Sequence, residues 1–182
     1  LGSALDDSLS GGGDGDSLSG AEGADTLDGG TGDDNLEGNQ GSDRLVGGDG
    51  ADTLNGFSDN DTTIGGQGDD VHFVGQAGDV VIEEEGGGTD TVWVTAAYTG
   101  SYVLPGHVEN LVLFGGTSLP GTGNGLDNAI TGNANGNALT GLGGADTLIG
   151  GAGSDTLDGA TGADGARDVA SYAGSLAGVR VL

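Results

Sequence analysis

Aspartate recurs at every ninth residue over long stretches of this sequence, and each of these aspartates sits in or just after a glycine-rich run. The stretch GGTGDDNLE, residues 29–37, shows the unit: three glycines, two adjacent aspartates and one leucine. Carboxylates are hard oxygen ligands, and glycine lets backbone carbonyls converge on a small volume because it has no side chain. Calcium takes six to eight such oxygens at about 2.3 to 2.6 Å, whereas magnesium is smaller and sheds water reluctantly. The pattern therefore predicts an array of calcium sites.

The pattern G-G-x-G-x-D-x-L-x runs without a slip through seven units that start at residues 11, 20, 29, 38, 47, 56 and 65. Its sixth positions, together with Asp7 from a degenerate unit before them, are Asp7, Asp16, Asp25, Asp34, Asp43, Asp52, Asp61 and Asp70. A second array starts at Gly123, and its sixth positions are Asn128, Asn137, Asp146, Asp155 and Asp164. Between the arrays, GGTDTVWV keeps Asp90 in the sixth phase.

Some units depart from this pattern. Asp14 and Asp59 stand where the third glycine belongs, so we expect sites that use those turns to be weakened or reshaped. Asn128 and Asn137 are neutral and cannot offset a dication. We therefore expect metal-free coils there, in which stacked asparagines hydrogen-bond along a ladder.

Composition excludes several classes of partner. The 182 residues include 44 glycines, 29 acidic residues and only 3 cationic ones, for a formal charge of −26. Binding to nucleic acid or anionic lipid needs the lysines and arginines that are missing here. Without cysteine there is no disulfide framework and no thiolate metal site. High acidity and glycine content alone would indicate disorder, and the strict period argues against it.

No apolar run reaches transmembrane length, and no signal-peptide pattern opens the sequence. The absence of methionine predicts an excised or processed segment of a larger protein.

The alternation around each leucine, as in DTLD, predicts a short strand with one inward side chain and polar neighbours outward. The glycine-rich half must then be the turn, and no 3.6-residue period supports a helix. If two units make one coil, odd units form one sheet and even units the other, with neighbouring strands about 4.8 Å apart. At that spacing adjacent aspartates repel by roughly 3 to 4 kcal/mol at an effective dielectric near 20, so the coil needs counter-ions.

This nonapeptide resembles the RTX, or hemolysin-type calcium-binding, repeats of proteins exported by Gram-negative type I secretion. The resemblance covers both arrays, about two-thirds of the chain. It implies an all-β fold: a right-handed parallel β-roll or β-helix solenoid with two nonapeptide units per coil and a wider β insert outside the repeat. It also implies several calcium ions between same-side turns, bound by sixth-position aspartates and glycine-turn carbonyls.

Carried over to this sequence, the resemblance pairs Asp25 with Asp43, Asp34 with Asp52, Asp43 with Asp61, and Asp52 with Asp70. The other aspartates that it implies as ligands are Asp7, Asp16, Asp90, Asp146, Asp155 and Asp164. The glycines at matching carbonyl positions are Gly12, Gly23, Gly30, Gly32, Gly41, Gly48, Gly50, Gly66, Gly68, Gly144, Gly151 and Gly153.

We expect an N-terminal array over 1–73, a wider β insert over 74–122, a second array over 123–167 and closing strands over 168–182, all in one continuous domain. The insert holds the only tryptophan, Trp93, and two of the three tyrosines, and a larger local core that joins the arrays is favoured over a ligand platform. His72, at a leucine position, is predicted to be a packed or rim imidazole. Glu83 to Glu85 are predicted to form a solvated acidic edge.

Catalytic patterns are absent. There is no H-E-x-x-H and no G-x-S-x-G, and G-x-G-x-x-G matches are expected by chance in so glycine-rich a chain. DNDTTIGGQGDD lacks the spacing of an EF-hand. We therefore expect no enzymatic activity and no cofactor other than calcium.

The leading functional hypothesis is a structural, secretion-assisting module of a secreted or cell-surface protein of a Gram-negative bacterium, which folds on binding extracellular calcium. Further possible partners are the type I secretion apparatus and other copies of the chain, which would assemble through sheet edges. Binding to nucleic acid and insertion into a membrane are not expected. One alternative is a segment of a surface adhesin or S-layer. Another is the tail of a secreted protease, lipase or polysaccharide-modifying enzyme whose catalytic domain lies elsewhere.

Overall fold

The computed structural model describes residues 1–160, 167–171 and 180–181. These described residues form only strands, turns and connecting segments, so the fold is all-β as expected. None of them belongs to a helix long and apolar enough to cross a bilayer. The chain divides into two compact units, Leu1–Thr91 and Val92–Leu182, and each is described by itself.

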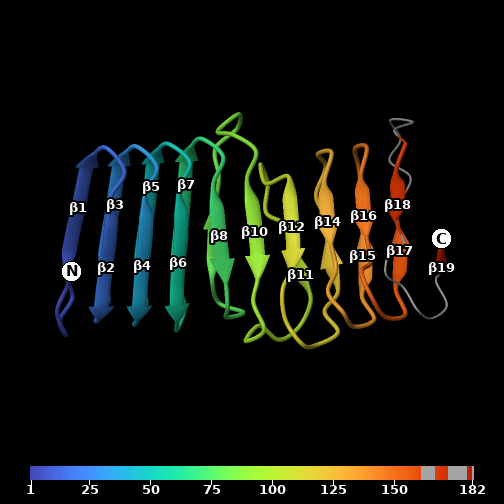
Figure 1. Cartoon of the computed structure of the whole chain (residues 1–182), viewed down its shortest axis with the longest axis horizontal. Helices are drawn as coiled ribbons and strands as arrows, with labels where there is room; N and C mark the ends of the chain where they lie inside the picture. Colours follow the sequence, from blue (N-terminus) through green and yellow to red (C-terminus); the bar gives the residue numbers. More distant parts are fainter. Residues whose placement is uncertain (161–166, 172–179, 182) are drawn as a thin grey trace. The chain divides into compact units, whose positions relative to one another are not determined.

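The first unit is built from short parallel strands that alternate between two sheets (Figure 1). One sheet has the order β1-β3-β5-β7-β9, and the strands of the other follow the order β2-β4-β6-β8. The strands are β1 (Ser8–Gly13), β2 (Ser17–Glu22), β3 (Thr26–Thr31), β4 (Asn35–Gln40), β5 (Arg44–Asp49), β6 (Thr53–Ser58), β7 (Thr62–Gln67), β8 (Val71–Val74) and β9 (Val80–Ile82). The prediction that odd and even units form separate sheets is confirmed.

Strand register fixes the coil at two nonapeptides. Leu27 in β3 pairs with Leu45 in β5, and Leu36 in β4 pairs with Leu54 in β6, each 18 residues apart. Because side chains alternate across a strand, the leucine points inward while its neighbours face outward. Leu27, Leu36, Leu45 and Leu54 are fully buried and form the core of this unit.

The nine-residue phase continues beyond residue 73. Thr63 pairs with Val81, and Leu54 pairs with His72, so both ladders of core positions extend into β8 and β9. His72 is fully buried, which confirms its prediction as a packed imidazole.

The second unit contains β10 (Thr91–Val94, whose first residue belongs to the first unit), β11 (Tyr102–Val103), β12 (Asn110–Leu113), β13 (Gly121–Thr122), β14 (Ala129–Thr131), β15 (Ala138–Thr140), β16 (Thr147–Ile149), β17 (Thr156–Asp158), β18 (Val169–Ser171) and β19 (Arg180–Val181). Its sheets have the orders β10-β12-β14-β16-β18 and β11-β13-β15-β17-β19. Leu111 pairs with Ile130 across 19 residues, whereas Ile130 pairs with Leu148 across 18. Coils in this unit thus begin wider, return to the nonapeptide length, and widen again at the end, where Leu148 pairs with Ala170 across 22 residues.

The insert has a local core in which both of its tyrosines, Tyr98 and Tyr102, are buried, but Trp93 does not lie inside it. Its neighbours Val92 and Val94 are buried, whereas Trp93 is only half-buried on the opposite side of β10. Its ring lies against that of Phe114, with centroids 5.8 Å apart and planes tilted by 49°. The reason is strand alternation, which turns inward the two valines that flank the tryptophan.

Candidate metal centres

The sixth-position aspartates of the first unit form two rows in which consecutive members are 18 residues apart and hydrogen-bonded. The backbone N–H of Asp25 donates to Oδ1 of Asp43 (2.8 Å), and that of Asp43 donates to Oδ1 of Asp61 (2.9 Å). In the other row the same bond joins Asp34 to Asp52 and Asp52 to Asp70, each at 2.8 Å. One carboxylate oxygen of each accepting aspartate is therefore hydrogen-bonded to the backbone of the preceding coil.

The second oxygen of these carboxylates is buried without a hydrogen-bond partner. Among the residues that the structure describes, this holds for Oδ2 of Asp16, Asp25, Asp34, Asp43, Asp52, Asp61, Asp70 and Asp155. A buried anionic oxygen with no donor is costly, so a row of them indicates a missing positive charge.

Glycine makes room for this second oxygen. A Cβ added at Gly29 would overlap Asp34 Oδ2, and one added at Gly47 would overlap Asp52 Oδ2. A Cβ added at Gly48 would likewise overlap the carbonyl oxygen of Gly30, one coil earlier. Carboxylate and carbonyl oxygens thus crowd a turn from which side chains are excluded.

All twelve glycines whose carbonyl oxygens are implied as calcium ligands adopt positive φ, between 84° and 135°. Asp14 (φ 67°) and Asp59 (φ 73°) occupy the same left-handed conformation in the two units of the first array that lack the third glycine. Aspartate tolerates this region better than most residues, so the turn persists there. These two turns keep their backbone shape while adding a side chain.

Burial raises the pKa of the stacked carboxylates. The pKa of Asp52 rises to about 6 and those of Asp61 and Asp70 to about 7, because desolvation and then the charges of neighbouring carboxylates outweigh the lowering effect of the backbone hydrogen bond. The pKa of Asp43 is raised for the same reasons. The row resists full ionisation unless a cation balances it.

The donor set fits calcium. It combines buried carboxylate oxygens with carbonyl oxygens and contains no thiolate, which is the chemistry of a hard cation that takes many oxygen ligands. The residues that would hold the ions are the stacked aspartates and the glycine turns between them. Assignment of each ligand pair stays a prediction.

The side-chain amides of the two sixth-position asparagines in the second array hydrogen-bond to backbone groups. Asn137 Oδ1 accepts from the N–H of Asn133 in its own turn (2.9 Å), and Asn137 Nδ2 donates to the carbonyl of Leu119, 18 residues earlier (2.9 Å). Asn128 makes the equivalent bonds to Asn124 and to the carbonyls of Val108 and Glu109. The prediction of an asparagine ladder is therefore wrong: the two residues lie in units of opposite parity and bond to the main chain.

The other predicted aspartates are placed as follows. Asp90 accepts from the Asp70 N–H across 20 residues (2.9 Å). Asp146 and Asp155 accept from the N–H groups of Asn128 and Asn137, both at 2.9 Å. Asp7 is half-buried and its Oδ2 accepts from the N–H of Ser3 (2.6 Å).

Asp164 lies outside the described residues. Asp168 takes the sixth-position contact instead, because its Oδ1 accepts from the Asp146 N–H (3.0 Å) and its Oδ2 lies where a Cβ on Gly159 would be. Four extra residues separate this glycine from its aspartate, and the period alone therefore did not find Asp168.

Asp79 was also missed. It follows Asp70 by nine residues, and its Oδ1 accepts from the Asp61 N–H (3.2 Å). Its Oδ2 accepts from the N–H groups of Gly75 and Gln76, so this carboxylate is satisfied by its own turn. The spacing was a usable signal, but the glycine pattern around Asp79 is lost.

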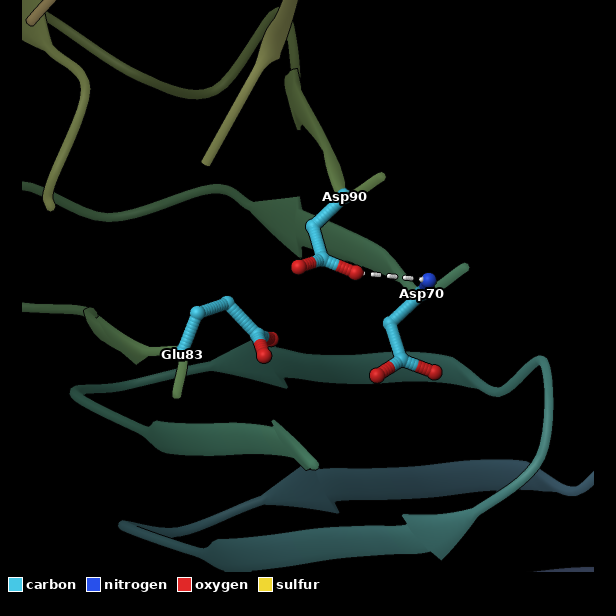
Figure 2. A group of neighbouring side chains, drawn as sticks. All are labelled: Asp70, Glu83 and Asp90. Carbon is cyan, nitrogen blue, oxygen red and sulfur yellow. Dashed lines mark hydrogen bonds between the residues drawn. The ribbon is translucent and has the colours of Figure 1, made fainter. Parts of the chain in front are cut away.

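The prediction of a solvated acidic edge is wrong for Glu83, although Glu84 and Glu85 are exposed. Glu83 is buried, and its Oε1 lies 2.5 Å from Nε2 of the core residue His72. Figure 2 shows its carboxylate directed toward those of Asp70 and Asp90. Glu83 directly follows β9, and the alternation of that strand, continued by one residue, turns it inward like Val81.

The fold and its rows of stacked carboxylates define a parallel β-solenoid of nonapeptide coils. The profile of the RTX calcium-binding nonapeptide repeat matches residues 1–36, 37–71 and 131–166, with four copies in all, which together span more than half of the chain. The chain therefore belongs to the RTX calcium-binding repeat family. No curated protein matches it at a significant level. The matched family is a calcium-binding repeat, and no catalytic family is indicated.

Proposed function

We propose that this chain is the calcium-driven folding module of a secreted or cell-surface protein, disordered where calcium is scarce and folded outside the cell. The observation that carries the proposal is the row of buried Oδ2 atoms without hydrogen-bond partners in the described residues. Ions that bind only the folded coil add RT ln(1 + [L]/Kd) per site to its stability. Without calcium, a formal charge of −26 opposes folding, and one leucine per nonapeptide provides little apolar burial to stabilise the coil.

Circular dichroism during calcium titration tests this function, and small-angle scattering on the same samples follows the radius. We expect a coil-like, expanded chain in chelator and a cooperative gain of β signal and compactness with calcium. Magnesium at equal concentration is the matched control and should produce little change. A compact β spectrum in excess chelator would refute the proposal.

A role in secretion, and attachment to an adhesin, an S-layer or a secreted enzyme, are finer proposals about the parent protein. The family is typical of proteins secreted by Gram-negative bacteria, and this supports an extracellular destination for the module. Electron microscopy of the calcium-loaded chain separates the assembly role from the others. Regular arrays support a lattice segment, whereas isolated particles support a module that works alone or beside an enzyme.

A further inference from the structure

One group of carboxylates departs from the repeat pattern. Asp70, Glu83 and Asp90 each offer an oxygen, and these three atoms lie within 4.8 Å of one another (Figure 2). The exposed fractions of the three residues are 1%, 7% and 0%. Asp70 and Asp90 are sixth-position residues, but Glu83 comes from the first position of its coil, where preceding coils have Gly47 and Gly65.

Glu83 is held in place by the end of a strand ladder. Pairing of β7 with β9 stops at Ile64 and Ile82, and the next amide, that of Gly65, donates to Glu83 Oε1 instead (3.1 Å). The Gly66 N–H approaches Oε2 at 3.4 Å. His72 Nε2 lies 2.5 Å from Oε1, and His72 Nδ1 in turn lies 2.8 Å from the hydroxyl of Thr63. In the folded coil the carboxylate is therefore held in position by protein groups.

An unpaired buried oxygen points into this group. Asp70 Oδ1 accepts from the Asp52 N–H, whereas Asp70 Oδ2 has no hydrogen-bond partner. A Cβ added at Gly65 would overlap both Asp70 Oδ2 and Glu83 Oε1, so both oxygens converge on a space that only glycine leaves open.

Charge decides between a structural and a ligand-binding role. When ionised, the three carboxylates carry three negative charges in a buried space, and His72 can offset one of them at most. Two negative charges then remain, which is the charge that one divalent cation balances.

We propose that Asp70, Glu83 and Asp90 form a calcium site of a second kind, in which a glutamate from the strand end adds a third carboxylate to the two aspartates of a repeat site. Calcium affinity rises with the charge and rigidity of the ligand set. This site should therefore fill at lower calcium concentration than the repeat sites. The inference rests on calcium binding by the folded module, as proposed above.

Glu83→Gln is the decisive variant, because the amide oxygen can still accept from the glycine N–H groups while the charge is lost. Glu84→Gln is the matched control, since it removes the same charge from the adjacent, exposed side chain. By isothermal titration we expect Glu83→Gln to lose the tightest calcium from the parent's binding profile or to weaken it by at least roughly 10- to 100-fold, the range seen for lost outer-shell partners. Glu84→Gln should bind as the parent does.

Tight binding in Glu83→Gln that equals the parent's would overturn the proposal. A parent that shows no calcium-induced β signal would instead refute the proposed function, so the two failures are distinguishable. If Glu83→Gln does not fold, a crystal structure of the parent grown in calcium decides. An ion bound by Glu83 together with Asp70 and Asp90 supports the site, and an ion without Glu83, or none at all, overturns it.

Discussion

Each stacked aspartate gives its two carboxylate oxygens different tasks. Asp43 Oδ1 accepts from the Asp25 N–H and joins two coils, while Asp43 Oδ2 is buried without a hydrogen-bond partner. An asparagine at this position has a single oxygen, and its Nδ2 is a donor that cannot bind a cation. Asn137 shows the outcome in the second array: its Oδ1 accepts within its own turn, and its Nδ2 donates to the Leu119 carbonyl of the earlier coil.

Asp43→Asn should therefore lower calcium stoichiometry and raise the calcium concentration at the folding midpoint, because Asp43 faces both Asp25 and Asp61 in its row. The loss of folding stability should exceed that caused by removing an ordinary surface charge, which changes the free energy of unfolding by no more than about 0.5 kcal/mol. Asp28→Asn, at an exposed outward position, is the control with the same charge change. Isothermal titration of both variants and the parent measures the effect. Equal stoichiometry in all three would contradict the assignment of ligands to the sixth position.

Asn137→Asp is expected to destabilise the second unit without adding an ion. The new carboxylate cannot donate to the Leu119 carbonyl, and it lies next to Asp155 in the row. A buried acceptor left unpaired costs about 1 to 3 kcal/mol, and carboxylate repulsion adds to this. Thermal melts in saturating calcium, combined with ion counting, test it against Asn135→Asp, a half-buried asparagine of the same turn. A gain of one bound calcium in Asn137→Asp would show that the repeat position alone makes a site.

Strands and turns were predictable from local sequence to the extent that the nonapeptide is intact. One inward leucine per unit and a glycine-rich turn gave the two alternating sheets and the fully buried Leu27 and Leu45. Asp168 was not predicted because an insertion shifts it out of the nine-residue phase. Burial of Glu83 was not predicted because three consecutive glutamates indicate a solvated segment unless the strand register is known. Both depend on which coil lies alongside, and periodicity cannot supply that once the repeat breaks.

Close stacking of turns predicts a position-dependent cost for alanine in place of glycine. Gly66 (φ 115°) and Gly12 (φ 101°) both have positive φ, so an alanine is strained by roughly 1 to 2 kcal/mol at either. A Cβ at Gly66 would also overlap the Gly48 carbonyl, whereas a Cβ at Gly12 meets nothing within 4 Å. Gly66→Ala should therefore lower the melting temperature in calcium more than Gly12→Ala does. Equal losses would show that backbone strain alone sets the glycine requirement.

At the scale of the whole molecule, a charge of −26 and the crowded carboxylates make protons competitors of calcium. Asp52, Asp61 and Asp70 have pKa values raised to about 6, 7 and 7 in the calcium-free fold. Their ordinary value is 3.8, so between these limits the folded state binds more protons than the unfolded chain. Stability of the calcium-free fold then rises as pH falls.

Calcium-depleted chain should accordingly gain β structure as pH is lowered from 8 to 5, while its apparent calcium affinity declines. Circular dichroism across this range measures the first effect and calcium titrations at both limits measure the second. The range stops at pH 5 because the sequence pI is about 4.1 and a chain near zero net charge precipitates. Loss of β signal on acidification would mean that the carboxylates are stabilised as anions without calcium.

The bonds that sixth-position aspartates make between coils all run in one direction along the first unit. In these bonds an N–H from the earlier coil meets a carboxylate from the later one, as in Asp34 to Asp52. The fifth-position carboxylate of Asp33 instead accepts from the Ala51 N–H of the later coil. Cleavage of the array between two coils would therefore leave sixth-position N–H donors and fifth-position carboxylates on the N-terminal fragment, and the groups that pair with them on the C-terminal fragment. Two copies of the same cut surface repel or leave their polar groups unmatched, whereas unlike surfaces fit. The two fragments should thus recombine only head to tail, in the register in which bonded residues are 18 apart in the intact sequence.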